Sequence, residues 1–301
     1  MQMKTNKQIQ YSKISGFSLI EMAIVLVIIG LLAGGILLPI SEQLQNTRLT
    51  DNENQMQTIK EALIGFAISN GRLPCPATLT SSGMESPQGG GNCTLQHGFV
   101  PFQSLGLSGQ FNQDNLYSDP WNNPFGYSVT VRDINQNGQA DFTTTGELQN
   151  IINDITLVDE TTTHLGLRAL TLTYVDSMYW SPGPGPCAGS GNTNCNDLEV
   201  YNDTGAGRAT LTYNAPAVIY SLGKNWAEYN VAGTGIPSPY EAENVGNTIN
   251  GSRTYNIAGN TEFISREKSE QQGNTFDDEV VWISKPILIG KLLTAGHISA
   301  P

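Results

Sequence analysis

The chain of 301 residues has little positive charge and little histidine. It contains 15 Lys and Arg residues against 27 Asp and Glu residues, which gives a net charge of −12. This balance argues against a nucleic-acid partner, because binding to phosphates requires a basic surface. The three histidines, His97, His164 and His297, lie far apart in the sequence, so we expect no histidine-rich metal centre.

The signature motifs of the common enzyme classes are missing as well. The chain has no GxSxG nucleophile elbow, HExxH zinc motif, phosphate-binding P-loop or dinucleotide fingerprint. Acidic neighbours such as Asp159 and Glu160 would act in glycoside hydrolysis only with partners brought in by folding, and a solvated surface is the simpler interpretation. We therefore expect a protein that is not an enzyme.

Only one stretch of the sequence is apolar and long enough for a bilayer. Residues 17–40 contain a single charge, Glu21, and as a helix would extend about 36 Å at about 1.5 Å per residue. The preceding residues 1–16 carry three lysines and no acid, which by the positive-inside rule keeps them in the cytoplasm. We expect a cytoplasmic leader over residues 1–16, a transmembrane helix over residues 17–40, and an extracytoplasmic location for the rest.

Glu21 distinguishes this segment from a plain membrane anchor. A carboxylate inside the membrane costs about 3 kcal/mol, and the apolar segment itself offers it no partner. Cleavage after Gly16 would give Phe17 a free α-amino group with a pKa of about 7.7–8. Because that ammonium could pair with the Glu21 of a neighbouring copy, the cost would be offset when subunits associate. An ordinary secretory signal fits less well, since its apolar region is shorter and its cleavage site follows that region.

Residues 16–21, GFSLIE, followed by an apolar helix, resemble the class III leader of type IV prepilins and type II secretion pseudopilins. The resemblance implies that a membrane prepilin peptidase cleaves after Gly16 and N-methylates Phe17. It also implies a filament in which Glu21 neutralises the N-terminus of the adjacent subunit. The implied partners are the peptidase, other pilin or pseudopilin subunits and an inner-membrane assembly platform. Pro39 stands one residue later than the helix-kinking proline common in major pilins.

The helical pattern continues through residues 41–70. Met56, Ile59, Leu63 and Phe66 are spaced to lie on one helix face, and Gly71 with the prolines after it would end the helix. We expect one helix over residues 17–70, weakened in the middle by two glycines and a proline. Its amphipathic second half, residues 41–70, should pack under a globular head.

The head, residues 71–301, combines short apolar runs with turn-rich loops. Strands are predicted over residues 127–132, 169–175, 217–222 and 280–284. The expected fold is α+β and pilin-like, with the long N-terminal helix packed against an antiparallel β-sheet and with long loops. Residues 119–127 and 219–223 resemble segments of major pseudopilins, although this head is larger, and residues 73–76 and 277–284 resemble other large pilin-like proteins. Tight turns and aromatic core anchors account for these stretches.

Four cysteines lie in the head, outside the cytoplasm, where disulfides persist. They allow three connectivities. We favour the two local pairs, Cys75–Cys93 and Cys187–Cys195, because each would close a loop with little core of its own. The first pair would stabilise the fold by about 3 kcal/mol in the chain-entropy model. A zinc site is the alternative, and no CxxC spacing supports it.

Two acidic segments are candidate calcium sites. The first has oxygen side chains at positions 1, 3, 5 and 9 of a calcium loop, namely Asp133, Asn135, Asn137 and Asp141. It carries Thr144 where position 12 requires a glutamate, and its Asn-Gly pair is also an ordinary hairpin turn. The second is the run of Asp277, Asp278 and Glu279, which gains support from the resemblance, since major pseudopilins bind calcium in their C-terminal loops.

The sequence therefore predicts a structural subunit of a type IV pilus or a type II secretion filament, serving protein secretion or cell adhesion. The size of the head favours a minor or specialised subunit. Before assembly it would be a single-pass inner-membrane protein with a periplasmic head, and after assembly part of a periplasmic or cell-surface filament. The alternative is a membrane-tethered extracytoplasmic binding or adhesion module that acts on a surface or a glycan. An anchored hydrolase ranks third.

Overall fold

The computed structural model describes most of the chain in two compact units, residues 1–48 and residues 49–301, which are considered separately. The described residues are 16–135, 137–157, 164–167, 170, 198–203, 207–226, 238, 240–241, 244, 262–271 and 275–299, with the side chains of 33–41 left out. The predicted pair Cys187–Cys195 lies outside this set.

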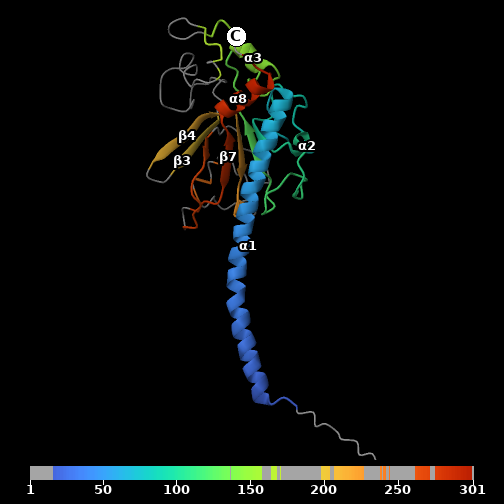
Figure 1. The fold of residues 1–301 in the computed structure, drawn as a ribbon, viewed down its shortest axis with the longest axis vertical. Helices are drawn as coiled ribbons and strands as arrows, with labels where there is room; N and C mark the ends of the chain where they lie inside the picture. Colours follow the sequence, from blue (N-terminus) through green and yellow to red (C-terminus); the bar gives the residue numbers. More distant parts are fainter. Residues whose placement is uncertain are drawn as a thin grey trace, which may run out of the picture. The chain divides into compact units, whose positions relative to one another are not determined.

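Helix α1 (Leu19–Asn70) is the long helix labelled in Figure 1. It contains 52 residues and belongs to both units. It begins two residues later than expected and ends at the expected residue. The helix ends because Gly71 adopts a φ of +70°, and the Gly71 N–H donates to the carbonyl of Ala67 at 2.8 Å. Pro39 lies inside the continuous helix rather than at a break.

The first unit exposes its apolar side chains. Phe17 is 82% exposed and Leu19 92% exposed, and the other large apolar side chains through Leu32 are exposed too. Over the residues that the structure describes, none of the helices combines the length and the apolar character needed to cross a bilayer. The membrane span over residues 17–40 stays a prediction.

The second unit contains two β-sheets. The larger has the order β1 (His97–Phe99), β2 (Gly126–Val129), β5 (Ala217–Ser221) and β7 (Glu279–Ile283), with every neighbouring pair antiparallel. The smaller has the order β4 (Arg208–Ala215), β3 (Leu198–Asp203) and β6 (Glu262–Ile264), in which β3 pairs antiparallel with β4 and parallel with β6. Three short helices complete the described elements, namely α2 (Phe102–Leu105), α3 (Glu147–Asn153) and α8 (Lys285–Ala295).

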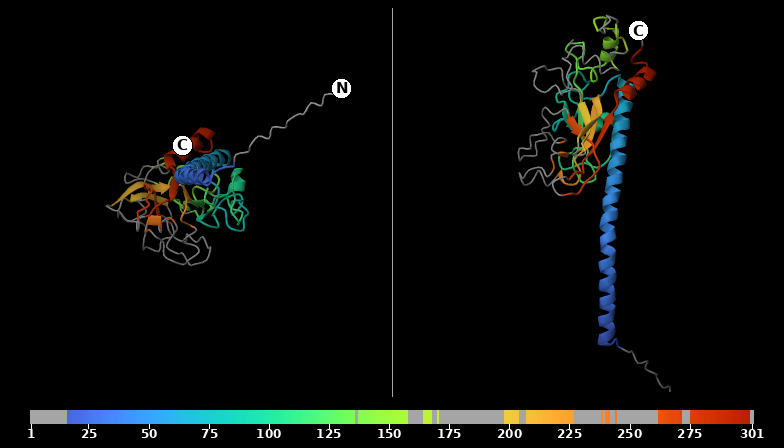
Figure 2. Two further views of the ribbon diagram at one scale, coloured as in Figure 1. Left: turned by 90° about the horizontal axis from the view of Figure 1, so that it is seen from below. Right: turned by 90° about the vertical axis from the view of Figure 1, so that its left-hand side faces the viewer.

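Alternate side chains of a strand point to opposite sides of a sheet, and the larger sheet has a packed layer on each side. One face packs against α1 and α8 through a set of apolar side chains: Met56, Ile59, Leu63, Tyr127, Val129, Ala217, Ile219, Ile283, Leu288 and Leu292. The other face packs against the smaller sheet through a second set: Val218, Tyr220, Val280, Leu198, Val200, Ala215 and Phe263. The head is therefore a helix layer and two sheet layers in an α+β fold (Figure 2).

Most strand predictions agree with the structure. The strands predicted at 127–132, 217–222 and 280–284 are β2, β5 and β7, whereas residues 169–175 lie almost entirely outside the described set. The prediction of which α1 side chains form the apolar face that packs in the core is wrong at one position. Ala67, not Phe66, enters the core, and the Phe66 ring lies 5.1 Å from the guanidinium carbon of Arg72.

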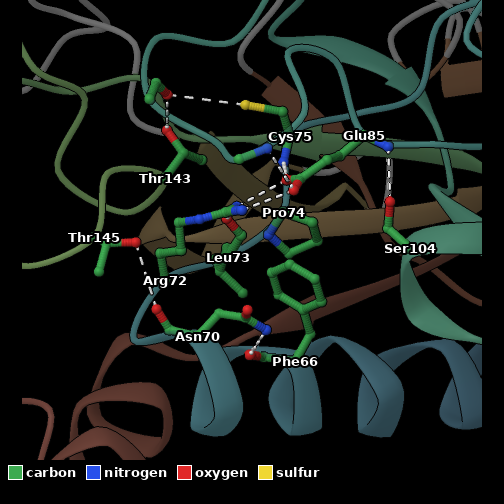
Figure 3. A network of polar contacts seen from close by, with 12 residues as sticks. Phe66, Asn70, Arg72, Leu73, Pro74, Cys75, Glu85, Ser104, Thr143 and Thr145 are labelled. Atoms are coloured by element: carbon green, nitrogen blue, oxygen red, sulfur yellow. Dashed lines mark hydrogen bonds and ion pairs between the residues drawn. The ribbon is translucent and has the colours of Figure 1, made fainter.

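A buried ion pair and a disulfide hold the first loop of the head in place. Two guanidinium nitrogens of Arg72 donate to the carboxylate of Glu85, both at 2.7 Å, and this carboxylate also accepts the backbone N–H groups of Cys75 and Gly89 at 3.1 Å (Figure 3). Cys75 is disulfide-bonded to Cys93, the first of the two local pairs that the sequence favoured. A segment of 18 residues is thereby closed beside the end of α1.

Candidate functional site

The N-terminus of α1 is closed by a reciprocal pair of hydrogen bonds. The backbone N–H of Ser18 donates to Oε2 of Glu21 at 2.8 Å, and the backbone N–H of Glu21 donates to the Ser18 hydroxyl oxygen at 3.2 Å. This is a capping box, in which a serine and a glutamate three residues later satisfy the free amides of the first turn. The expectation that Glu21 lacks a partner within its own segment is therefore wrong, because Ser18 provides one.

The expected cleavage site lies just before the helix that the capping box begins. Since the helix begins at Leu19, Gly16 and Phe17 precede it and have no helical hydrogen bonding. Phe17 is 82% exposed, so the peptide bond between these two residues lies on accessible, non-helical backbone. A backbone of this kind is the usual substrate of a processing peptidase.

The calcium loop predicted at residues 133–141 is only partly assembled. The carboxylate of Asp133 accepts the backbone N–H groups of Asn137 at 3.1 Å and Gly138 at 2.7 Å, which closes the loop. Asp141 does not join it. Its buried carboxylate pairs with the Nε of Arg132 at 3.2 Å and accepts the backbone N–H of Ile134 at 3.0 Å. This geometry gives no support to Asp141 as a calcium ligand, because its carboxylate is already paired with the cationic guanidinium of Arg132.

The second candidate calcium site is formed by a different set of residues from the run of Asp277, Asp278 and Glu279 that the sequence suggested. Glu241, Asp277 and Asp278 place one carboxylate oxygen each within 4.8 Å of one another. Glu279 lies outside this acidic cluster, since its Oε2 accepts the side-chain amide of Asn52 at 2.8 Å and lies 3.7 Å from Lys268. Sequence spacing could not reveal Glu241, because folding alone brings it beside Asp277, 36 residues away.

Burial gives the acidic cluster unusual electrostatics. Desolvation, with the nearby charge of Glu241, raises the pKa of Asp277 to about 6. Desolvation also raises the pKa of Asp278 well above its ordinary value. Backbone amides of Lys224 and Asn225 donate to one oxygen of Asp277, while its Oδ1 is buried without a hydrogen-bond partner in the described part of the chain. Three close carboxylates with a free oxygen have the chemistry of a site for a hard divalent cation.

The segment at residues 119–127 forms a buried turn. One oxygen of Asp119 accepts the backbone N–H groups of Trp121 and Asn123, and the other accepts the hydroxyl of Ser221 at 2.7 Å. Burial raises the pKa of Asp119 to about 6. Asn123 then donates to the carbonyl of Gly223 at 2.6 Å, so the turn connects β2 with the end of β5. This geometry agrees with a structural role.

A long N-terminal helix whose first part is apolar and exposed, followed by a disulfide-bonded α+β head with an antiparallel sheet, is consistent with a pilin-like fold. Residues 11–37 match the family model described as the prokaryotic N-terminal methylation motif. The chain therefore carries the class III leader of type IV prepilin-like and pseudopilin-like proteins, and the prediction of this leader is confirmed. The motif implies processing by prepilin peptidase and assembly with other pilin subunits. Comparisons with curated proteins and with solved structures gave no match.

Proposed function

We propose that the protein is a subunit of a type IV pilus or a type II secretion filament. The observation that carries this proposal is the methylation motif at residues 11–37, in which the cleavage site lies directly before a capped helix. Prepilin peptidase cleaves between Gly16 and Phe17 and methylates the new α-amino group of Phe17. The mature chain then polymerises through α1.

The capping box leaves Glu21 ready for a second partner. Only Oε2 of Glu21 accepts a hydrogen bond within the described residues, so Oε1 is available. Cleavage creates an ammonium group at Phe17. Glu21 is the first acidic residue that follows Phe17 in the sequence. In a filament, Oε1 of Glu21 in one subunit accepts a hydrogen bond from the Phe17 ammonium of its neighbour. This ion pair lowers the cost of placing both charges among apolar helices.

The precursor is proposed to be a single-pass inner-membrane protein with an extracytoplasmic head. Three observations support this location. The leader is basic, the large apolar side chains from Phe17 to Leu32 are exposed and require an apolar cover, and the head contains a disulfide. The second disulfide, Cys187–Cys195, belongs to the same proposal.

Mass spectrometry of the membrane-extracted protein tests the processing step. Cells that contain the peptidase should yield a chain that begins at N-methylated Phe17, and cells without it should yield a chain that begins at Met1. An intact Met1 terminus in both strains would reject the filament proposal and favour the membrane-tethered binding module.

A pair of matched variants tests the assembly step. Glu21→Ala should reduce incorporation into purified filaments, because the ammonium of the neighbouring subunit would lose its partner. Glu42→Ala, which removes an exposed carboxylate further along the same helix, should leave incorporation unchanged. Equal incorporation of both variants would contradict the pairing. Immunogold labelling of the filaments would then show whether the subunit is minor and specialised, as the size of its head suggests.

We also propose that the acidic cluster of Glu241, Asp277 and Asp278 binds calcium and stabilises the end of the larger sheet. The supporting observation is the convergence of three carboxylates, of which those of Glu241 and Asp278 are buried, beside an unpartnered oxygen of Asp277 among the described residues. The resemblance to major pseudopilins, which bind calcium in their C-terminal loops, also supports this site. Its test is the Asp277→Asn variant described in the Discussion.

A further inference from the structure

Glu147, at the start of α3, lies against the loop of residues 133–141. Its side chain is buried, with only 2% of the residue exposed. Oε1 accepts the side-chain amides of Asn135 at 2.8 Å and Asn137 at 2.7 Å, and Oε2 accepts the side-chain amide of Asn150 at 3.1 Å. Glu147 is thus surrounded by three neutral amide groups.

This carboxylate has no positive partner among the side chains that the structure describes. The ion pairs found there do not include Glu147, and Arg132, the basic residue next to the loop, is paired with Asp141. Buried charges in proteins are normally paired with a cationic group or bound to a metal, because the loss of hydration is otherwise too costly. Neutral amides compensate this cost only in part.

The two asparagines of the loop can supply oxygen instead of nitrogen. A half-turn of an asparagine amide exchanges its NH2 group and its oxygen with little change in shape. Oδ1 of Asn135 is buried and has no hydrogen-bond partner within the described residues. After the half-turn of both amides, two amide oxygens and the Glu147 carboxylate would face one another. The half-turn of Asn137 would also break the hydrogen bond that the backbone N–H of Gln139 donates to its Oδ1 at 2.9 Å, so only a cation between these oxygens would make that arrangement favourable.

We propose that residues 133–147 form a calcium site whose closing carboxylate is Glu147. The ligands are side-chain oxygens of Asp133, Asn135, Asn137 and Glu147. The carbonyl oxygen of Gln139 is the backbone ligand that a calcium loop has at its seventh position. Asp133 binds the ion while its carboxylate still accepts two loop amides, since each carboxylate oxygen has two lone pairs.

Glu147 replaces the glutamate that calcium loops usually carry at position 12, where this chain has Thr144. It reaches the loop because Gly146 adopts a φ of +82° directly before α3, which turns the chain back toward the asparagines. Five protein ligands that include amide and backbone oxygens suit Ca²⁺, whereas Mg²⁺ keeps most of its waters. The site is independent of filament assembly, and it shares no residue with the acidic cluster of Glu241, Asp277 and Asp278.

Calorimetric titration of the full-length chain in detergent micelles, freed of metal by a chelator, tests this site. The titrations use an Asp277→Asn background, in which the acidic cluster lacks one of its carboxylates. One calcium ion should bind in this background, more tightly than magnesium. Glu147→Gln should weaken the affinity by more than about tenfold, since even residues outside the ligand shell of a metal site contribute that much.

Two further variants complete the design. Asn137 is exposed on the turn, so Asn137→Ala leaves the buried carboxylate of Glu147 intact. This variant should also weaken calcium binding, and it tests the site if Glu147→Gln fails to fold. Gln139→Ala is the matched control, because its proposed ligand is the backbone carbonyl, and its affinity should not change. Absence of calcium binding in the Asp277→Asn background, or unchanged affinity in both Glu147→Gln and Asn137→Ala, would overturn the proposal.

Discussion

The ion pair between Arg72 and Glu85 should contribute far more to stability than another ion pair of the same length. The side chains of Arg72 and Glu85 are 6% and 7% exposed, and their closest atoms lie 2.7 Å apart. Arg208 and Glu262 also approach to 2.7 Å, but their side chains are 39% and 20% exposed. Arg208 in addition lies 3.2 Å from Asp203, so this control removes two ion pairs of an exposed guanidinium. The comparison of these two pairs separates the effect of burial from the effect of distance.

Replacement of Arg72 by methionine leaves the carboxylate of Glu85 buried without its charged partner. Removal of one member of a buried pair costs about 3–5 kcal/mol, whereas an exposed pair contributes about 0–1 kcal/mol. Arg72→Met should therefore lower the free energy of unfolding by about 3–5 kcal/mol, and the control Arg208→Met by less than about 1 kcal/mol. The double variant Arg72→Met/Glu85→Gln should be more stable than Arg72→Met alone, because no buried charge remains.

Urea denaturation of the full-length chain in mild detergent, followed by tryptophan fluorescence, measures these differences. The method reports on the head, because all four tryptophans, Trp121, Trp180, Trp226 and Trp282, lie after α1. Losses of similar size in Arg72→Met and Arg208→Met would refute the reasoning from burial. A double variant less stable than Arg72→Met would refute the reasoning from the unpaired charge.

Three further predictions concern the head. Burial lowers the pKa of His97 to about 4 from an ordinary value of 6.5, so the unfolded chain takes up a proton before the folded chain does. The free energy of unfolding should therefore fall by about 3 kcal/mol as the pH drops from 6.5 to 4. His97→Asn should lack this loss in denaturation curves recorded across that range. Asp277→Asn relieves repulsion in the acidic cluster, so it should raise the melting temperature measured in a chelator at pH 7. It should also reduce the rise in melting temperature that calcium causes in the parent protein. An undiminished rise with calcium would contradict calcium binding by the acidic cluster. Replacement of Cys75 and Cys93 by serine should cost about 3 kcal/mol in urea denaturation, because it opens a loop of 18 residues, and an unchanged midpoint would contradict this.

Local signals in the sequence predicted the main helix and the larger sheet. The limits of α1 depend on neighbouring residues, since Gly71 and the prolines after it end the helix. Strands β5 and β7 are mostly apolar runs, and β2 carries the large residues Tyr127 and Val129, so all three could be recognised from local sequence. The smaller sheet was not predicted, because β4 is half exposed and β6 has only three residues, so neither forms a clear apolar run.

The candidate sites were harder to predict because they depend on tertiary neighbours. The sequence motif placed Asp133, Asn135 and Asn137 in one loop, and calcium binding by this loop stays a prediction. The motif also included Asp141, but it could not show that Arg132 binds this carboxylate. Glu147 and Glu241 approach their partners from outside the local patterns, and spacing rules do not report such contacts. The capping box at Ser18 and Glu21, by contrast, is a local pattern of a serine followed three residues later by a glutamate, which the sequence alone displays.

The part of α1 that packs in the head has a mechanical consequence. Its buried side chains, from Asn52 to Ala67, lie along the helix axis against the sheet and α8. A tension applied along that axis loads these contacts together in shear, whereas a sideways force would peel them apart one after another. Just beyond the helix, the covalent bridge at Cys75 keeps the next loop from unravelling under the same load. Pulling experiments with optical tweezers should therefore find the head more resistant to axial than to transverse extension.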